Sequence, residues 1–173
     1  MILARRSIAG TITSSLLVTL MLLGIVIVGS MQPNERVLDD AKLARFRFSG
    51  MENCLMRKIN VARRRHGRAA LSRDKQLGYV ARIHSNRMAR STSIWHDNVT
   101  DKVTRWRRIG QNVGRGGGCK RLFRAFMHSY AHRKNILGRW RFMGVANEWC
   151  NGRVYVHMIF ESRRDPGNIW HHP

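Results

Sequence analysis

The chain has 173 residues, of which 32 are Lys or Arg and 10 are Asp or Glu, so its formal net charge is +22. This length suits one domain of ordinary size, and a hydrophobic fraction of 43% excludes a wholly disordered polyelectrolyte. The three cysteines lack CxxC spacing, which excludes a zinc ribbon, a thioredoxin site and a ferredoxin cluster. Because 26 of the 32 cations are Arg, a skew that genomic base composition can produce, the charge alone does not predict a nucleic-acid ligand.

An uncharged segment lies near the N-terminus. No residue between Arg6 and Glu35 is charged, and residues 16–28 are almost wholly apolar. Cations before this segment and acids after it predict that the rest of the chain is exported. Residues 1–30 are therefore a signal peptide or an N-terminal membrane anchor: the short apolar core suits a cleaved signal, whereas the uncharged span 8–29 is long enough to cross a bilayer. Both alternatives place the domain outside the cell.

A linker and one folded domain follow. Residues 31–50 are mixed and polar and form the predicted linker. The domain is expected over 51–163, with a tail at 164–173. A first helix is predicted over 51–66, because its apolar residues recur at helical spacing and Gly67 follows as a stop.

A second helix is predicted from around Asp74. Its apolar stripe has the spacing of an amphipathic helix and comprises Leu77, Val80, Ala81, His84 and Met88. We expect His84 to be a core histidine bonded to the backbone, because a buried polar group needs a partner. The glycine-rich stretch 91–118 is predicted as a long loop with room for further short strands, and such loops are often functional.

A third helix and a hairpin complete the predicted domain. The apolar side of this helix, which we expect to be core, comprises Leu122, Phe123, Phe126 and Tyr130. Two strand-like runs, 141–149 and 153–161, flank Asn151-Gly152, which is a strong hairpin signal. Helices together with these strands predict an α+β layered domain.

Five motifs follow one another along the domain. They are INVARRRHG at 59–67, ARIHSNRMA at 81–89, Trp95-His96, IGQNVGRGG at 109–117 and AFMHSYAHRKNIL at 125–137, with FMGVANEW and RVYVHMIF after them. Their order and spacing resemble the CAP superfamily, named for cysteine-rich secretory proteins, antigen 5 and plant pathogenesis-related class 1 proteins, in its bacterial SCP-like branch. The resemblance covers residues 53–161.

The resemblance implies an exported three-layer α-β-α sandwich with a cleft lined by two His and two Glu. Carried over position by position, the two His fall on His96 and His132, and the glutamate of the family's GEN motif falls on Gln111. The helix glutamate falls on or near Ser129, where bacterial relatives often lack an acid too. Two of the four cleft positions therefore keep the His, and two lack the carboxylate.

This cleft is poor in the groups that hydrolysis needs. No Asp or Glu lies between Asp101 and Glu148, a stretch that holds twelve cations. General acid–base catalysis uses a group that titrates near neutral pH, and Gln111 cannot take a proton. We therefore interpret the chain as a non-enzymatic binding domain. The alternative is a metal-assisted envelope hydrolase or protease that uses His96 and His132, although two imidazoles are only half of a tetrahedral zinc shell. An anionic oxygen would improve such a site, so Gln111→Glu is expected to raise zinc affinity.

Several ligands fit this interpretation. A lipid or another envelope or host ligand is expected from the resemblance. An electrostatic binder of anionic polymers or lipid headgroups is a further interpretation, since the chain from Met31 carries 30 cations and 10 anions. A solvated Arg-rich surface without a specific partner is an equally simple alternative. No specific nucleic acid is expected, and residues 8–29 contact the membrane if they are not cleaved. The exported compartment permits one disulfide, whose pairing among Cys54, Cys119 and Cys150 stays open.

Overall fold

The computed structural model describes residue 42 and residues 45–103 and 106–162. The predicted signal peptide or anchor at 1–30 and the predicted tail at 164–173 lie outside this part of the chain. Among the described residues, no helix is both long and apolar enough to cross a membrane.

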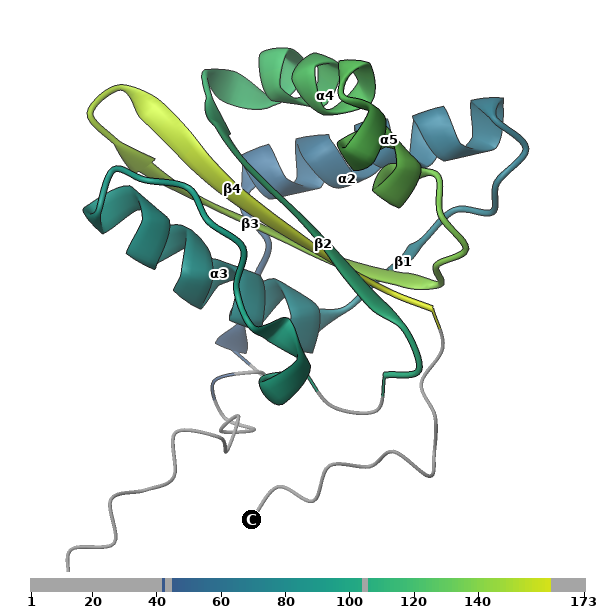
Figure 1. Ribbon diagram of the computed structural model, residues 1–173, viewed down its shortest axis with the longest axis horizontal. Coiled ribbons are helices and arrows are strands. Elements are labelled where there is room, and N and C mark those ends of the chain that lie inside the picture. Colours follow the sequence, from purple (N-terminus) through teal and green to yellow (C-terminus); the bar gives the residue numbers. More distant parts are fainter. Residues whose placement is uncertain (1–41, 43–44, 104–105, 163–173) are drawn as a thin grey trace, which may run out of the picture. The chain divides into compact units, whose positions relative to one another are not determined.

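A four-stranded sheet forms the centre of the domain (Figure 1). Its strands run in the order β1-β3-β4-β2 and are β1 (Ser72–Arg73), β2 (Ile109–Gly116), β3 (Phe142–Cys150) and β4 (Arg153–Glu161). β1 is parallel to β3, and the other two pairings are antiparallel. β3 and β4 are the predicted hairpin. Their turn residues Asn151 and Gly152 have φ values of 50° and 68°, as a tight two-residue turn requires.

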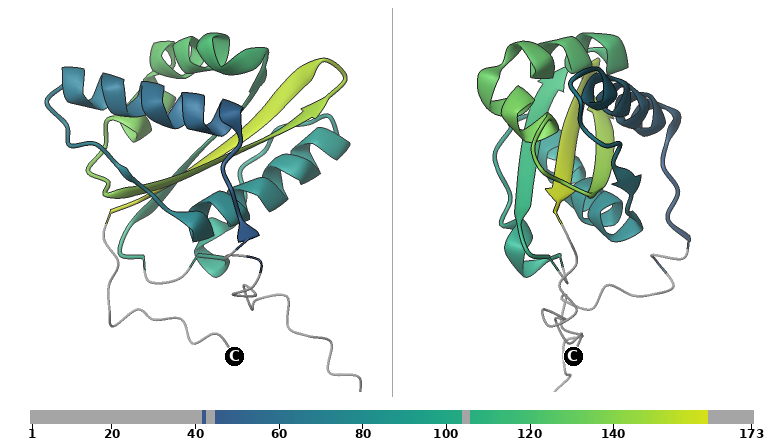
Figure 2. Two further views of the ribbon diagram at one scale, coloured as in Figure 1. Left: turned by 180° about the vertical axis from the view of Figure 1, so that it is seen from behind. Right: turned by 90° about the vertical axis from the view of Figure 1, so that its right-hand side faces the viewer.

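Helices cover both faces of the sheet. α2 (Gly50–Arg65), α4 (Gly118–His128) and α5 (Tyr130–Ile136) lie on one face, and α3 (Lys75–Arg90) lies on the other (Figures 1 and 2). The predicted α+β class is confirmed. The predicted long loop is partly regular, because it contains the short helix η1 (Val99–Asp101) and strand β2.

The two long helices match the sequence predictions closely. α2 begins after a capping box, in which the Ser49 hydroxyl accepts from Glu52 N and the Glu52 carboxylate accepts from Ser49 N. α3 begins after Asp74, whose side chain accepts from Leu77 N. Each cap thus satisfies a backbone donor that a helix start leaves without a partner.

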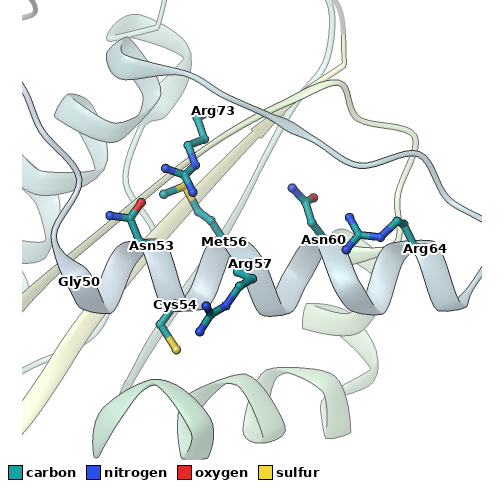
Figure 3. A pocket seen from close by; sticks show the side chains of 8 residues that line it. All are labelled: Gly50, Asn53, Cys54, Met56, Arg57, Asn60, Arg64 and Arg73. Carbon is teal, nitrogen blue, oxygen red and sulfur yellow. The ribbon is translucent and has the colours of Figure 1, made fainter.

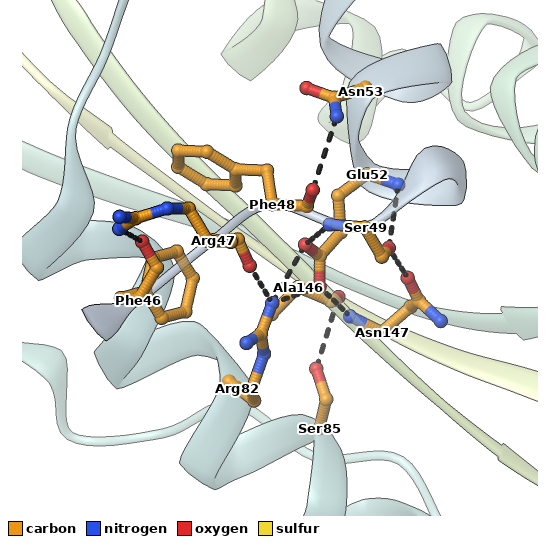
Figure 4. A network of polar contacts seen from close by, with 10 residues as sticks. All are labelled: Phe46, Arg47, Phe48, Ser49, Glu52, Asn53, Arg82, Ser85, Ala146 and Asn147. Carbon is orange, nitrogen blue, oxygen red and sulfur yellow. Dashed lines mark hydrogen bonds and ion pairs between the residues drawn. The ribbon is translucent and has the colours of Figure 1, made fainter. Parts of the chain in front are cut away.

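A buried carboxylate joins α2 to the elements around it (Figure 4). Glu52 is 1% exposed. Its carboxylate accepts from Arg82 of α3 at 2.9 Å and from the backbone N of Asn147 in β3 at 3.2 Å. Arg82 also donates to the Arg47 carbonyl and stacks 4.2 Å from the Phe46 ring centroid. Ordered packing therefore continues into the residues that precede α2.

Glycine sets the distance between α3 and the sheet. A Cβ at Gly144 of β3 would lie 2.1 Å from the backbone N of Gly78 and 2.5 Å from Leu77 Cβ. No larger residue fits there without moving the helix backbone, so Gly144 lets α3 pack directly on β3.

The third predicted helix is in fact two helices, and the prediction that Tyr130 lies in the core is wrong. α4 ends at His128, and the extended backbone of Ser129 (φ −78°, ψ 121°) breaks the helix before α5 starts. The break turns Tyr130 outward, and its side chain is 71% exposed, whereas Phe126 is buried as predicted. Helical periodicity cannot show such a break, because Ser129 is neither Gly nor Pro.

β4 is buried on both faces, as the central partner of β2 and β3. One set of alternating side chains packs in the core under α2, α4 and α5, and comprises Val154, Val156, Met158 and Phe160. The other set faces α3 and comprises Tyr155, His157 and Ile159. His157 is thus a polar side chain placed inside an apolar layer.

A disulfide joins α2 to α4. Cys54 of α2 and Cys119 of α4 are bonded, with their Cα atoms 6.3 Å apart, and Cys150 is free. This settles the pairing that the sequence left open.

Candidate functional site

Side chains from the sheet and from α3 hold the backbone on both sides of His96. The Nε2 of His84, a fully buried residue of α3, lies 2.7 Å from the Trp95 carbonyl oxygen. A carbonyl only accepts, so this nitrogen carries the proton. The prediction of a core histidine bonded to backbone is therefore confirmed for His84.

Gln111 of β2 forms hydrogen bonds with the backbone of Asp97, the residue that follows His96. Its amide nitrogen donates to the Asp97 carbonyl at 2.7 Å, and its amide oxygen accepts from Asp97 N at 3.1 Å. This paired geometry needs one donor and one acceptor on the same side chain, which an amide has and an ionised carboxylate lacks. Gln111 thus acts as a clamp on the loop that carries His96.

His157 supports the clamp from within the core. It is fully buried, and its Nε2 donates to the Gln111 amide oxygen at 3.0 Å. Burial, reinforced by His84, lowers the pKa of His157 to about 3, so the ring is neutral near pH 7. The rings of His157 and His84 lie 4.8 Å apart between centroids. Sequence analysis missed His157. The only signal for it was a single histidine within an apolar strand.

The Asp97 carboxylate is paired with Lys102. Burial raises the pKa of the Asp97 carboxyl, but the hydrogen bond from Lys102 at 2.6 Å, the positive charge of Lys102 and smaller contributions from His84 and His157 together outweigh it, so the pKa lies below its usual value. The His84 Nδ1 lies 3.8 Å from the same oxygen, too far for a hydrogen bond. The acid nearest to His96 in the sequence is therefore committed to Lys102.

The side chain that follows Gln111 joins β2 to α5. Neighbouring residues of a strand point to opposite faces, and Asn112 donates to the His132 carbonyl at 3.1 Å. The side-chain amide nitrogen of Asn135 in α5 donates two hydrogen bonds, to the Gln111 carbonyl at 3.0 Å and to the Asn112 amide oxygen at 2.9 Å. These bonds fix the helix that carries His132 against the edge strand.

His96 and His132 approach this edge from its two sides. His96 is exposed, and His132 is half-buried with its ring 5.1 Å from that of Phe126. Burial lowers the pKa of His132, and the nearby His96 lowers it further, so the two imidazoles lie within electrostatic range of each other. In the described part of the chain, Ser129 forms no side-chain hydrogen bond to either of them. The role of His96, Gln111, Ser129 and His132 as a ligand cleft stays a prediction.

The described residues offer two imidazoles at this edge and no third protein ligand. Within residues 42, 45–103 and 106–162, no three His, Cys, Asp or Glu side chains group closely enough to hold a metal ion. The Gln111 amide, the third candidate, is engaged with Asp97 and His157.

Comparison with known proteins gives the family. The model of the CAP domain, described as the cysteine-rich secretory protein family, matches residues 56–161. This range contains all four strands of the sheet and all of the predicted cleft positions. The chain belongs to the CAP family. A search of curated proteins gave no match.

Solved structures of several other proteins share this fold. An outer surface protein of Borrelia burgdorferi is 14% identical with a TM-score of 0.62, over 69% of this chain and 97% of that one. An extracellular protein with an SCP domain from Bacillus anthracis is 24% identical with a TM-score of 0.55, over 72% of this chain and 50% of that one. A cysteine-rich secretory protein of Staphylococcus aureus is 21% identical with a TM-score of 0.52, over 68% of this chain and 40% of that one. This CAP chain therefore spans half or less of the two longer bacterial proteins.

Proposed function

We propose that this CAP protein is a non-catalytic extracellular domain that binds an anionic ligand of the cell envelope. The observation that carries the proposal is the charge on its surface. In the part of the chain that the structure describes, 22 Lys and Arg residues are exposed, whereas the exposed acids are Asp101 and Glu148. So large an excess of one sign attracts polyanions and speeds their association.

The other acids in the part of the chain that the structure describes do not neutralise this surface. Glu52 and Asp97 are paired with Arg82 and Lys102 inside the domain, and Asp74 and Glu161 are buried. The exposed cations therefore face solvent with few carboxylates beside them, which supports an anionic ligand.

The cleft supports binding over catalysis. Gln111 stands where the family pattern has a glutamate, and its amide is used to clamp the Asp97 backbone. A metal-assisted hydrolase using His96 and His132 would need a third ligand, which the described residues do not supply.

An extracellular location is supported by the family and by the uncharged segment that precedes the domain. The family is named for secretory proteins, and two of the similar structures are an outer surface protein and an extracellular protein. Residues 8–29 are free of charge, as an export signal or anchor requires.

The test is binding of the full chain, kept in a neutral detergent, to immobilised heparin and to neutral dextran. We expect heparin to retain the protein and dextran not to retain it. The logarithm of the affinity for heparin should fall linearly with the logarithm of the salt concentration. Absence of heparin binding at low salt would overturn the proposal, and so would retention that does not depend on salt.

A further inference from the structure

A cationic hollow runs along the exposed side of α2 (Figure 3). It has a volume of about 370 Å³, and Arg57, Arg64 and Arg73 line it. Arg57 and Arg64 are seven residues apart, so they lie two helical turns, or about 10 Å, apart on one side of α2. Arg73 reaches toward the helix from β1.

The three guanidinium groups are the free polar donors of this hollow. Both amide atoms of Asn60 are bonded to the backbone of Leu71, and the Asn53 amide nitrogen donates to the Phe48 carbonyl. No acidic residue lines the hollow, and its three arginines form no ion pair among the residues that the structure describes. An anionic ligand would therefore meet unneutralised charge.

A second cationic hollow lies at the start of α4. It has a volume of about 630 Å³, and its lining includes Lys120, Arg121, Arg124 and Trp149. The Trp149 side chain is 52% exposed. Its neighbour Glu148 points to the opposite face of β3, because adjacent strand residues alternate. This hollow thus combines three cations with one accessible aromatic ring.

The disulfide joins the two hollows. Cys54 lines the first and Cys119 lines the second, and their Cα atoms are 6.3 Å apart. From Cys54 to Arg64, α2 extends a further ten residues, or about 15 Å. The combined surface, here called the α2–α4 face, is therefore longer than one headgroup or one phosphate ion.

We propose that the α2–α4 face binds an extended anionic glycan, with anionic groups in both hollows and a sugar ring against Trp149. This inference rests on the proposed function and adds the surface and the class of ligand. One aromatic ring beside six cations favours a glycan over single-stranded nucleic acid, whose successive bases each need a stacking platform. The cations line hollows, and this also favours a glycan chain over a lipid bilayer, because the flat surface of a bilayer would contact side chains that protrude.

The experiment compares two pairs of substitutions with a matched control. Arg57→Gln/Arg64→Gln empties the first hollow of two charges, and Lys120→Gln/Arg124→Gln does the same in the second. Arg87→Gln/Arg90→Gln removes two exposed charges from α3, on the opposite face of the sheet. All six side chains are exposed, so unchanged melting temperatures are expected for the three variants.

Titration of the full chain in neutral detergent uses a long heparin oligosaccharide and a heparin disaccharide. We expect each hollow variant to bind the long oligosaccharide about tenfold more weakly than the wild type, and the α3 control to lose far less. We also expect the long oligosaccharide to bind much more tightly than the disaccharide, because one chain occupies both hollows.

Each contrary result separates this inference from the proposed function. Equal losses in all three variants would overturn the α2–α4 face and leave an anionic ligand in place, whereas no binding by the wild type would overturn both. A disaccharide that binds as tightly as the long chain would overturn the extended ligand. Single-stranded DNA that binds more tightly than heparin, or displacement of heparin by phosphatidylglycerol in mixed micelles, would replace the glycan with a nucleic acid or a lipid.

Discussion

Removal of the Cys54–Cys119 bond tests how much the link between α2 and α4 stabilises the domain. The two cysteines are 65 residues apart, and closing a loop of that length lowers the entropy of the unfolded chain by an amount worth about 4 kcal/mol. Small domains have free energies of unfolding of only about 5–15 kcal/mol. With a urea m-value of about 2 kcal/mol/M, we expect Cys54→Ser/Cys119→Ser to unfold at a midpoint about 2 M lower than the wild type.

Urea unfolding followed by circular dichroism measures this difference. The wild type in the presence of a reductant should unfold at the same urea midpoint as the double variant, because both lack the disulfide bond. Cys150→Ser is the control, because Cys150 is free, and it should keep the wild-type midpoint. A double variant that unfolds at the wild-type midpoint would refute the loop-closure argument. A control that loses as much as the double variant would show that cysteine removal itself, and not the bond, lowers stability.

Three other substitutions probe buried polar side chains by urea unfolding. Gln111→Glu should cost about 1–3 kcal/mol, because a carboxylate oxygen replaces the amide that donates to the Asp97 carbonyl; an unchanged midpoint would show that the clamp does not hold the loop. Burial lowers the pKa of His157 from 6.5 to about 3, so the unfolded chain takes up a proton that the folded protein excludes. The free energy of unfolding of the wild type should therefore fall by about 1.4 kcal/mol per pH unit as the pH falls below 6.5. His157→Gln should lose less, and parallel pH profiles would contradict this. Burial raises the pKa of Glu161 from 4.5 to about 7. The stability that its neutral carboxyl contributes is therefore present at low pH and is lost as the pH rises through 7. Glu161→Gln should therefore unfold at higher urea than the wild type at pH 8, and equal midpoints there would argue against it.

Elements with a local signature could be predicted from the sequence. The apolar stripe and the Asp74 cap determine α3, and Asn151-Gly152 supplies the positive φ angles of the β3–β4 turn. Both signals depend on residues a few positions apart, so a single sequence contains them in full. The sequence predicted only that short strands could lie within 91–118 and gave no bounds for β2, because glycines interrupt its pattern and its pairing with β4 depends on a partner about 45 residues away.

The site was less predictable, because its contacts join distant residues to backbone atoms. The motif around Gln111 predicted a cleft residue but not its hydrogen bonds. Its amide clamps the Asp97 backbone, and a backbone partner leaves no trace in the sequence. His157 lies among apolar residues of a strand that is buried on both faces. Alternation shows which residues share a face of the strand, but it does not show that His84 of α3 lies opposite His157.

The cleft and the α2–α4 face use different parts of the fold. The residues of the predicted cleft come from β2, α5, the loop after α3 and the break between α4 and α5, and the buried side chains of His84 and His157 lie on the α3 side of the sheet. The cationic hollows are built on α2, β1 and the first turns of α4, on the other side. Substitutions at distant sites that share no partner usually act additively on stability and binding. We therefore expect Arg57→Gln/Arg64→Gln to leave the His96 loop intact, so that the effect of the substitutions on ligand binding reports on the α2–α4 face.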